Sequence, residues 1–267
     1  MNLIALDLDG TTLNAAGKLT PLTIKTLQTL QAMGHKVVIT TGRPDNISVA
    51  FYDELQLTTP MINFDGALIT IPHQQWAAAQ EVTLDDAVIT DLLTLKEQYQ
   101  LKLVVAEGKN FLLSDRPFTN VPYLVDNPHP DTLLSAQTLP RRPISLTIFA
   151  AKDTLHEITR VISNKYPQLL INSWGAWLDK AIEITTQAAY KSRAVQYVAN
   201  YYHLPMTAVL AFGDDDNDVD MLKDAGLGVA MKNGNAHAKA AAQQQTSLTN
   251  DEDGVAHFLI DYFKLDL

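Results

Sequence analysis

The sequence contains no cysteine among its 267 residues. Disulfides, thiolate metal sites and cysteine nucleophiles are therefore excluded. It also has no apolar run near the roughly 18 residues that a membrane span requires. The first apolar run, at 3–6, meets Asp7 and Asp9 too early for a signal peptide. From these absences we expect a cytoplasmic protein that does not enter a membrane.

Positive charge is scarce as well. The 20 lysines and arginines are outnumbered by 30 aspartates and glutamates, so the formal net charge is −10. A protein that reads the phosphate backbone of nucleic acid normally carries a basic surface, and we therefore expect no nucleic-acid partner. Hydrophobic residues make up 46% of the chain and charged residues 19%, which is typical of a globular protein with a substantial core.

The chain opens with a short apolar strand that leads into two carboxylates. LIAL at 3–6 is followed at once by DLDGT at 7–11. Asp and Gly after an apolar run also occur in ordinary turns, so this pattern alone leaves both interpretations open. In an open α/β sheet, ligands bind at the carboxyl ends of the strands, which makes Asp7 and Asp9 candidate site residues.

Strands and helices alternate at both ends of the chain. Apolar runs predict buried strands at 3–6, 36–39, 60–64, 208–212 and 227–231. Helices are predicted from Thr20 and Pro21 to Gly34, from Pro44, through Leu222, and at 235–243. Short connections between alternating strands and helices imply right-handed crossovers and a parallel sheet. We therefore predict an α/β fold built on a doubly wound parallel sheet.

The middle of the chain has a different pattern, with many prolines and an antiparallel character. The sequence predicts helices at 84–99 and 153–166, and strands at 101–106, 111–114, 144–150 and 182–185. Residues 107–110, Glu-Gly-Lys-Asn, are a hairpin signal. We predict that 82–187 form an α+β insert and that the parallel-sheet domain combines 1–81 with 188–267.

Polar groups follow several of the predicted parallel strands. They are Asp7 and Asp9, then Thr41 with Arg43, and the acidic run 214–218. Parallel strands place these ends at one edge of the sheet, and Lys191 opens the helix that leads back from the insert. Clustered carboxylates repel one another unless a proton or cation intervenes. Carboxylates without histidine or cysteine suit Mg²⁺, which we expect as the cofactor.

Other metal and nucleotide motifs do not fit these residues. An EF-hand loop counted from Asp214 has Val219 where glycine is needed and Ala225 where glutamate is needed. A P-loop starting at Gly10 has six residues, not four, before Gly17 and the lysine that follows it. The acidic run therefore does not belong to either motif.

Four ordered motifs resemble those of the haloacid dehalogenase (HAD) superfamily of phosphatases. They are DLDGTTL at 7–13, TTGRP at 40–44, Lys191 ahead of a helix, and GDDDNDVDML at 213–222. FDGALI at 64–69, GLGVAM at 226–231, NDEDGVA at 250–256 and the position of the insert are similar to the Cof-type subfamily. The resemblance implies a HAD-like, Rossmann-like doubly wound core with an inserted α+β cap domain of the C2 type.

The resemblance also implies roles for individual residues. Asp7 would be the nucleophile that forms an aspartyl phosphate, and Asp9 the general acid and base. Mg²⁺ would be held by Asp7, the backbone carbonyl of Asp9 and Asp214. Thr41, Gly42 and Lys191 would bind the phosphoryl oxygens. Thr11 would have a role in the backbone turn as well as orienting Asp9, and Asn217 and Asp218 would position metal ligands or waters.

Two further residues have less defined roles. Arg43 would either contact substrate or pair with a carboxylate. Asp65 occupies the position where Cof-type proteins usually have asparagine, which adds negative charge near the site and makes Asp65 a possible substrate contact. The acids at 215, 216 and 220 are expected to be solvated residues at a helix N-terminus rather than metal ligands.

Taken with the resemblance, these residues predict a Mg²⁺-dependent phosphatase. Its substrates would be small phosphomonoesters such as sugar phosphates or phosphorylated cofactors and their precursors, and the protein would be a monomer or homodimer. A phosphomutase with the same nucleophile and acid is one alternative. A non-catalytic regulator that binds a phosphorylated metabolite is another.

Overall fold

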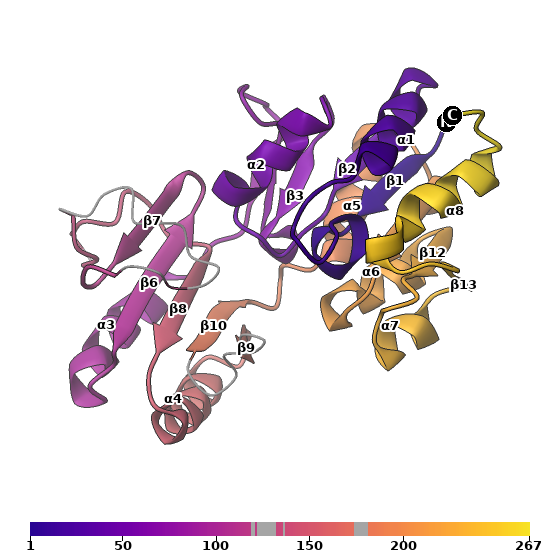
Figure 1. Ribbon diagram of the computed structural model, residues 1–267. Coiled ribbons are helices and arrows are strands. Elements are labelled where there is room, and N and C mark those ends of the chain that lie inside the picture. Colours follow the sequence, from indigo (N-terminus) through magenta and orange to yellow (C-terminus); the bar gives the residue numbers. More distant parts are fainter. Residues whose placement is uncertain (119–120, 122–131, 136, 174–180) are drawn as a thin grey trace. The chain divides into compact units, whose positions relative to one another are not determined.

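The computed structural model describes residues 1–118, 121, 132–135, 137–173 and 181–267 (Figure 1). It divides into two compact units. The core unit comprises Met1–Arg43, Ser48–Gln80 and Tyr190–Leu267, and the insert unit comprises Pro44–Ile47 and Glu81–Ala189. The predicted insert, 82–187, falls inside the second range of the insert unit. The grouping of Pro44–Ile47 with that unit has no counterpart in the sequence prediction.

A five-stranded parallel sheet organises the core unit, in the order β13-β12-β11-β1-β2. Its strands are β1 (Leu3–Leu6), β2 (Lys36–Ile39), β11 (Val209–Gly213), β12 (Leu227–Ala230) and β13 (Gln244–Gln245). Leu6 of β1 stands in register with Ile39 on one side and Phe212 on the other. Because β1 is flanked on both sides, its carboxyl end lies between the ends of two other parallel strands.

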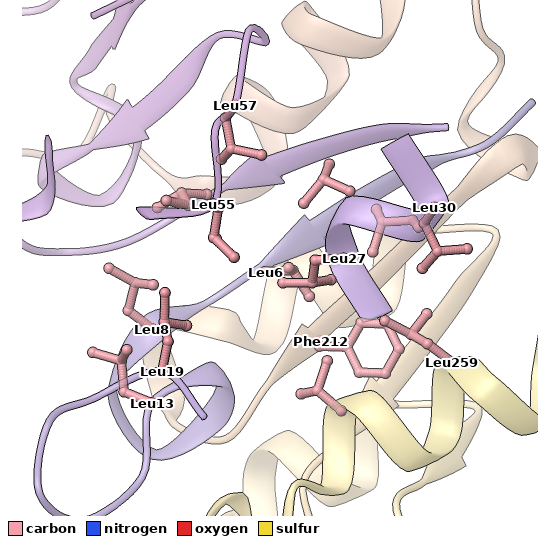
Figure 2. Close-up of a cluster of buried hydrophobic side chains, with 14 of the residues drawn as sticks. Leu6, Leu8, Leu13, Leu19, Leu27, Leu30, Leu55, Leu57, Phe212 and Leu259 are labelled. Atoms are coloured by element: carbon pink, nitrogen blue, oxygen red, sulfur yellow. The ribbon is translucent and has the colours of Figure 1, made fainter. Parts of the chain in front are cut away.

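Side chains alternate along these strands, so the sheet has two apolar faces. Ile4, Leu6 and Phe212 belong to a cluster with α1 (Pro21–Ala32), α8 (Gly254–Phe263) and the later part of α2 (Asp45–Glu54). Figure 2 labels Leu6, Leu27, Phe212 and Leu259 among the side chains of this cluster. Leu3, Ala5 and Ala211 pack instead with α5 (Lys191–Tyr201), α6 (Val219–Asp224) and α7 (Ala236–Ala241). The prediction of a doubly wound parallel sheet is confirmed.

The start of α1 follows the predicted capping pattern. The Thr20 hydroxyl accepts a hydrogen bond from the Thr23 backbone N–H at 3.1 Å, and Pro21 occupies the first turn, where its missing N–H costs nothing. The helix ends two residues before Gly34, which has a φ of 91°. The predicted helix start at Thr20 and Pro21 is confirmed.

The third predicted strand is only loosely tied to the parallel sheet. β3 (Met61–Asn63) meets it through a single parallel bridge between Thr40 and Ile62. The chain then turns back at Phe64–Gly66, and β3 pairs antiparallel with β4 (Leu68–Thr70) in a small sheet completed by β5 (Gln80–Glu81). This turn places Asp65 next to the end of β2.

The insert unit contains an antiparallel sheet in the order β7-β6-β8-β10-β9. Its strands are β6 (Leu103–Gly108), β7 (Phe111–Ser114), β8 (Ser145–Phe149), β9 (Leu169–Ser173) and β10 (Ala181–Thr186). Helices α3 (Asp86–Gln98) and α4 (Lys152–Lys165) share a separate hydrophobic cluster with this sheet. The predicted α+β character of the insert is confirmed.

The predicted hairpin turn at 107–110 is too long. Glu107 and Gly108 belong to β6, and Gly108 pairs with Phe111, so only Lys109 and Asn110 connect the strands. Asn110 has a φ of 59°, a left-handed conformation that asparagine tolerates. A two-residue turn therefore replaces the predicted four-residue turn, and Glu107 becomes a strand residue.

Short helical turns complete the described structure. They lie at Leu8–Thr12, Phe64–Gly66, Met206–Ala208, Asp216–Asp218 and Asn250–Glu252. In the part of the chain that the structure describes, every helix is too short or too polar to cross a membrane.

Candidate active site

Asp7 lies at the end of β1, where the chain leaves the sheet in a tight loop. Its backbone N–H donates to the Phe212 carbonyl at 3.1 Å, and its own carbonyl accepts from the Thr12 hydroxyl at 2.6 Å. Gly10 follows with a φ of 72°. A Cβ atom at Gly10 would overlap the Asp214 carboxylate, so this position requires glycine for space as well as for backbone conformation.

The end of β2 contributes Thr41 and Gly42. The Thr41 backbone N–H donates to the Ile62 carbonyl at 2.9 Å, and its hydroxyl accepts from the Arg43 N–H at 3.1 Å. The Asp65 N–H donates to the Thr41 carbonyl at 3.1 Å. These bonds fix the Thr41–Gly42 turn between the parallel sheet and the Phe64–Gly66 turn.

The end of β11 supplies the acidic run, and Asp218 fixes its shape. One oxygen of Asp218, Oδ2, accepts from the backbone N–H groups of Asp214 at 2.9 Å and of Asp215 at 3.2 Å. Asp215 in turn caps the following helical turn. Asp216 Oδ1 lies within hydrogen-bond distance of His237 Nδ1, at 2.8 Å. Asp215 and Asp216 therefore act as exposed residues at the start of a helix, as predicted.

Lys191 connects these strand ends from the first turn of α5. Its side chain is fully buried, and its Nζ donates to Asp7 Oδ1 and to Asp218 Oδ1, each at 2.7 Å. Asp65 Oδ1 lies 3.9 Å from the same nitrogen. Although burial alone disfavours an ammonium group, the carboxylates of Asp218, Asp7 and Asp65 raise the pKa of Lys191 above its ordinary value. Lys191 is therefore a permanent cation inside the site.

One cation does not balance the surrounding carboxylates. Burial, together with the charges of Asp218 and Asp214, raises the pKa of Asp7 well above its usual range, although Lys191 acts in the opposite direction. Burial also raises the pKa of Asp214 to about 6, helped by the neighbouring Asp218 and Asp215. Negative charge is therefore in excess at the ends of β1 and β11.

The donor set fits a hard divalent cation. Asp7, Asp214 and Asp218 each offer an oxygen within 4.8 Å of the others. Lys191 and backbone amides occupy the oxygens of Asp218, Lys191 occupies Asp7 Oδ1, and the Thr11 hydroxyl occupies Asp214 Oδ1 at 2.7 Å. Among the hydrogen bonds of the described residues, none uses Oδ2 of Asp7 or Oδ2 of Asp214, so these two oxygens are available as metal ligands. Paired carboxylate oxygens of this kind suit Mg²⁺.

Asp9 is engaged by a different cation. Its two carboxylate oxygens accept from Arg43 Nε and Nη2, each at 2.6 Å, in a bidentate ion pair. The Arg43 guanidinium also lies over the Phe51 ring, 5.4 Å from its centroid. Of the two roles predicted for Arg43, pairing with a carboxylate is the one that this structure contains.

Two predicted positioning residues have partners that the sequence does not predict. Thr11 was expected to orient Asp9, but its hydroxyl donates to Asp214, because the loop around Gly10 carries it toward the end of β11. Asn217 donates to Asp65 Oδ1 at 2.9 Å, so it holds Asp65. The roles expected for Thr11 and Asn217 stay predictions.

Sequence reasoning missed two asparagines that hold the Asp9 loop. Asn233 donates through Nδ2 to the Gly10 carbonyl at 2.7 Å, and Asn250 donates through Nδ2 to the Leu13 carbonyl at 2.8 Å. The backbone N–H of Asn250 also donates to Asn233 Oδ1 at 3.0 Å. The NDEDGVA segment at 250–256 was noted by resemblance alone, since no local pattern connects it with residues more than 200 positions away.

The chain matches a family model described as haloacid dehalogenase-like hydrolase over residues 4–259. Among curated relatives, the 5-amino-6-(5-phospho-D-ribitylamino)uracil phosphatase YitU of Bacillus subtilis is 35% identical over 271 residues, covering 98% of each chain. The pyridoxal phosphate phosphatase YbhA of Escherichia coli is 28% identical and covers 97% of each chain. Both alignments extend over the core and the insert.

Solved structures share the fold. A hypothetical protein from Geobacillus kaustophilus superimposes with a TM-score of 0.84 at 19% identity, covering 99% of each chain. A haloacid dehalogenase-like hydrolase from Bacteroides thetaiotaomicron has a TM-score of 0.82 at 24% identity, covering 98% of this chain and 99% of the other. At these identities the likeness establishes the fold alone. The activity has to be argued from the residues of the site.

Proposed function

Because the chain belongs to the haloacid dehalogenase-like hydrolase family, we propose that it is a Mg²⁺-dependent phosphatase that hydrolyses small phosphomonoesters through an aspartyl-phosphate intermediate. The observation that carries this proposal is the buried contact between Lys191 and Asp7, with Asp214 and Asp218 beside it. A carboxylate that accepts a hydrogen bond from a buried ammonium at the end of an inner parallel strand is placed for nucleophilic attack on phosphorus.

In the proposed reaction, an oxygen of Asp7 attacks the phosphorus atom. The bond from phosphorus to the leaving alcohol oxygen breaks, and that oxygen takes a proton from Asp9. A water molecule then attacks the phosphorus of the aspartyl phosphate and gives a proton to Asp9. The bond between Asp7 and phosphorus breaks, so inorganic phosphate leaves and the Asp7 carboxylate is restored.

Asp9 is paired with Arg43 where it would exchange a proton. Both of its oxygens accept hydrogen bonds from Arg43. Each oxygen has a second lone pair, and that lone pair would exchange the proton with the leaving oxygen or with water. We therefore assign Arg43 the task of holding Asp9 between turnovers, and Thr41, Gly42 and Lys191 the task of binding the phosphoryl oxygens.

The cation would be held by Asp7, Asp214 and the backbone carbonyl of Asp9, with Asp218 and Asn217 in supporting positions. When bound, Mg²⁺ supplies positive charge that offsets the carboxylates and polarises the phosphoryl group. The residues of this chain provide the rest: Asp218 shapes the end of β11, and Thr11 orients Asp214 through its hydroxyl.

The proposed substrate class is a small phosphomonoester, such as a sugar phosphate, a phosphorylated cofactor or a cofactor precursor. Two similar proteins support this class. The Bacillus relative is named for a phosphorylated ribitylaminouracil, and the Escherichia relative is named for pyridoxal phosphate. The core binds only the phosphoryl group in this proposal, so discrimination among alcohols belongs to the insert unit.

The proposal is tested by release of alcohol and phosphate from an aryl phosphate with Mg²⁺ present. EDTA should abolish the release and added Mg²⁺ should restore it. Asp7→Asn keeps the side-chain shape but removes the nucleophile, so turnover should fall by roughly a thousandfold or more with the fold intact. Asp261→Asn, the same change at an exposed position of α8, should leave turnover unchanged.

Four results would count against this function. Turnover that survives EDTA would contradict the metal site, and near-normal activity of Asp7→Asn would contradict the nucleophile. Conversion of a sugar phosphate to its isomer without release of phosphate would identify a phosphomutase instead. A screen of phosphorylated metabolites with no turnover of any compound would favour a binding regulator.

A further inference from the structure

A fourth carboxylate, that of Asp65, contacts Lys191, and the proposed reaction gives it no task. Asp65 lies in the turn between β3 and β4 with a φ of 52°. Its Oδ1 is 3.9 Å from Lys191 Nζ and accepts from Asn217 Nδ2 at 2.9 Å. The hydrogen bond from Asn217 and the ion pair with Lys191 hold this side chain in place although a third of it is exposed to solvent.

The same carboxylate lies against the Thr41–Gly42 turn. A Cβ atom at Gly42 would come within 3.1 Å of Asp65 Oδ1 and 3.3 Å of Oδ2. The Asp65 backbone is bonded to the Thr41 carbonyl as well. Asp65 therefore touches every group that the proposed function assigns to the phosphoryl oxygens, namely Thr41, Gly42 and Lys191.

The charges at this point do not balance. The single positive charge of Lys191 faces the carboxylates of Asp7, Asp65 and Asp218. Asp7 is used as the nucleophile, and Asp218 is fixed by the amides of the β11 loop. Asp65 is the remaining carboxylate of this group, and it lies against Gly42 and Lys191, which the proposed function assigns to the phosphoryl oxygens. Burial raises the pKa of Asp65, whereas Lys191 and the hydrogen bond from Asn217 act in the opposite direction and favour its charged form.

We propose that Asp65 is a specificity-determining residue of the phosphoryl pocket, whose negative charge weakens the binding of inorganic phosphate. This inference rests on the proposed function, because it takes Thr41, Gly42 and Lys191 as the phosphoryl pocket. A carboxylate against those groups repels the free phosphate dianion and so favours its release after hydrolysis. Productive substrates must then gain additional affinity from the alcohol part of the molecule.

A purely structural role for Asp65 is the competing explanation, because it also holds Asn217. Two substitutions separate the possibilities. Asp65→Asn removes the charge and keeps an oxygen that accepts from Asn217, and asparagine tolerates a left-handed backbone. Asp65→Ala removes both the charge and the acceptor. A charge effect should be common to both variants, whereas a structural effect should appear only in Asp65→Ala.

The experiment is calorimetric titration of inorganic phosphate into the full-length protein, with and without Mg²⁺, at constant ionic strength. The Kd for phosphate should fall about tenfold in Asp65→Asn, and Asp65→Ala should also bind more tightly than the wild type. Asp261→Asn removes the same charge from an exposed position and should stay within about twofold of the wild type.

The proposal is overturned if Asp65→Asn binds phosphate no more tightly than the wild type, including the case in which neither binds measurably. Tighter binding by Asp261→Asn to the same extent would overturn it too, because the effect would then be one of net charge. The proposed function is tested separately, by phosphatase turnover. Tighter phosphate binding without any phosphatase turnover would support the role of Asp65 and contradict the enzyme, and the reverse pattern would contradict only Asp65.

Discussion

Gly10 and Gly17 have nearly the same backbone conformation but different surroundings. Their φ angles are 72° and 67°. A Cβ atom at Gly17 would have no atom within 4 Å, whereas one at Gly10 would overlap Asp214. The two positions therefore separate the cost of a left-handed backbone from the cost of displacing an active-site carboxylate.

Gly17→Ala should lower the free energy of unfolding by about 1 kcal/mol, which is the strain of the left-handed conformation. Gly10→Ala should cost more, because the added methyl group must also push Asp214 aside. Urea unfolding measures both values. Gly10→Ala should in addition lose most of the stabilisation that added Mg²⁺ gives the wild type, and Gly17→Ala should keep it. Equal behaviour of the two variants would contradict this account.

At the level of single residues, the sequence predicted which strand ends come together. Asp7 and Asp214 follow parallel strands, and their carboxylates lie together in the structure. The pairing of Thr11 with Asp214 and of Asp65 with Asn217 was not predictable. Each depends on a loop conformation and on partners more than 150 residues away, for which local patterns carry no signal.

At the level of elements, the segment that begins at Asn250 contacts both the Asp9 loop and the start of α1. Asp253 accepts hydrogen bonds from the hydroxyls of Thr20 and Thr23 at the start of α1. Asn250 holds the Leu13 carbonyl at 2.8 Å. The loop that carries Asp9 is therefore fixed by contacts from a segment near the C-terminus.

Asn250→Ala should reduce kcat roughly tenfold and leave KM nearly unchanged, because Asp9 loses its exact placement while the phosphoryl groups are untouched. The free energy of unfolding should fall by only about 1 kcal/mol, the value of one hydrogen bond. Asn250→Asp keeps the size of the side chain but cannot donate, so it should behave like the alanine variant. Full activity in either variant would remove Asn250 from the positioning residues.

Element boundaries were predictable where the pattern was regular. The apolar strands and the capped start of α1 follow directly from the sequence. The turn at Lys109 and Asn110 is shorter than predicted, because cross-strand pairing of Gly108 with Phe111 extends β6 to Gly108. The weak attachment of β3 was not predictable, since the left-handed turn at Asp65 sends the chain back along its own strand.

At the level of the whole molecule, the two units have separate hydrophobic clusters and different electrostatic properties. In the insert unit, Glu107 is only 3% exposed. Burial raises its pKa from 4.5 to about 8, helped by the negative charges of Glu183 and Asp45. Between these pH values the folded insert keeps a proton that the unfolded chain releases.

The stability of the insert unit should therefore decrease as the pH rises from about 5 to about 8, by at most about 1.4 kcal/mol per pH unit. Below this window both states are protonated and the contribution of Glu107 is constant. Glu107→Gln should flatten the dependence, and Glu97→Gln, at an exposed position of α3, should not. Urea unfolding at several pH values measures this. Identical slopes for Glu107→Gln and the wild type would contradict the assignment.

The fold class was predictable because each unit obeys its own periodicity, with alternating strands and helices in the core and antiparallel strands in the insert. The short segment Pro44–Ile47, which groups with the insert unit, was not predictable. It follows Gly42 and Arg43 in the sequence, and nothing in its composition marks a change of unit. Such a boundary depends on tertiary contacts alone.

The arrangement of the parallel sheet sets an order of events during synthesis of the chain. β1 emerges from the ribosome first, but its partner β11 begins only at Val209. The strands of the insert are complete at Thr186. The strands of the antiparallel sheet are therefore all synthesised before β1 has both of its neighbours. Until β11 is made, one edge of β1 has no strand to pair with.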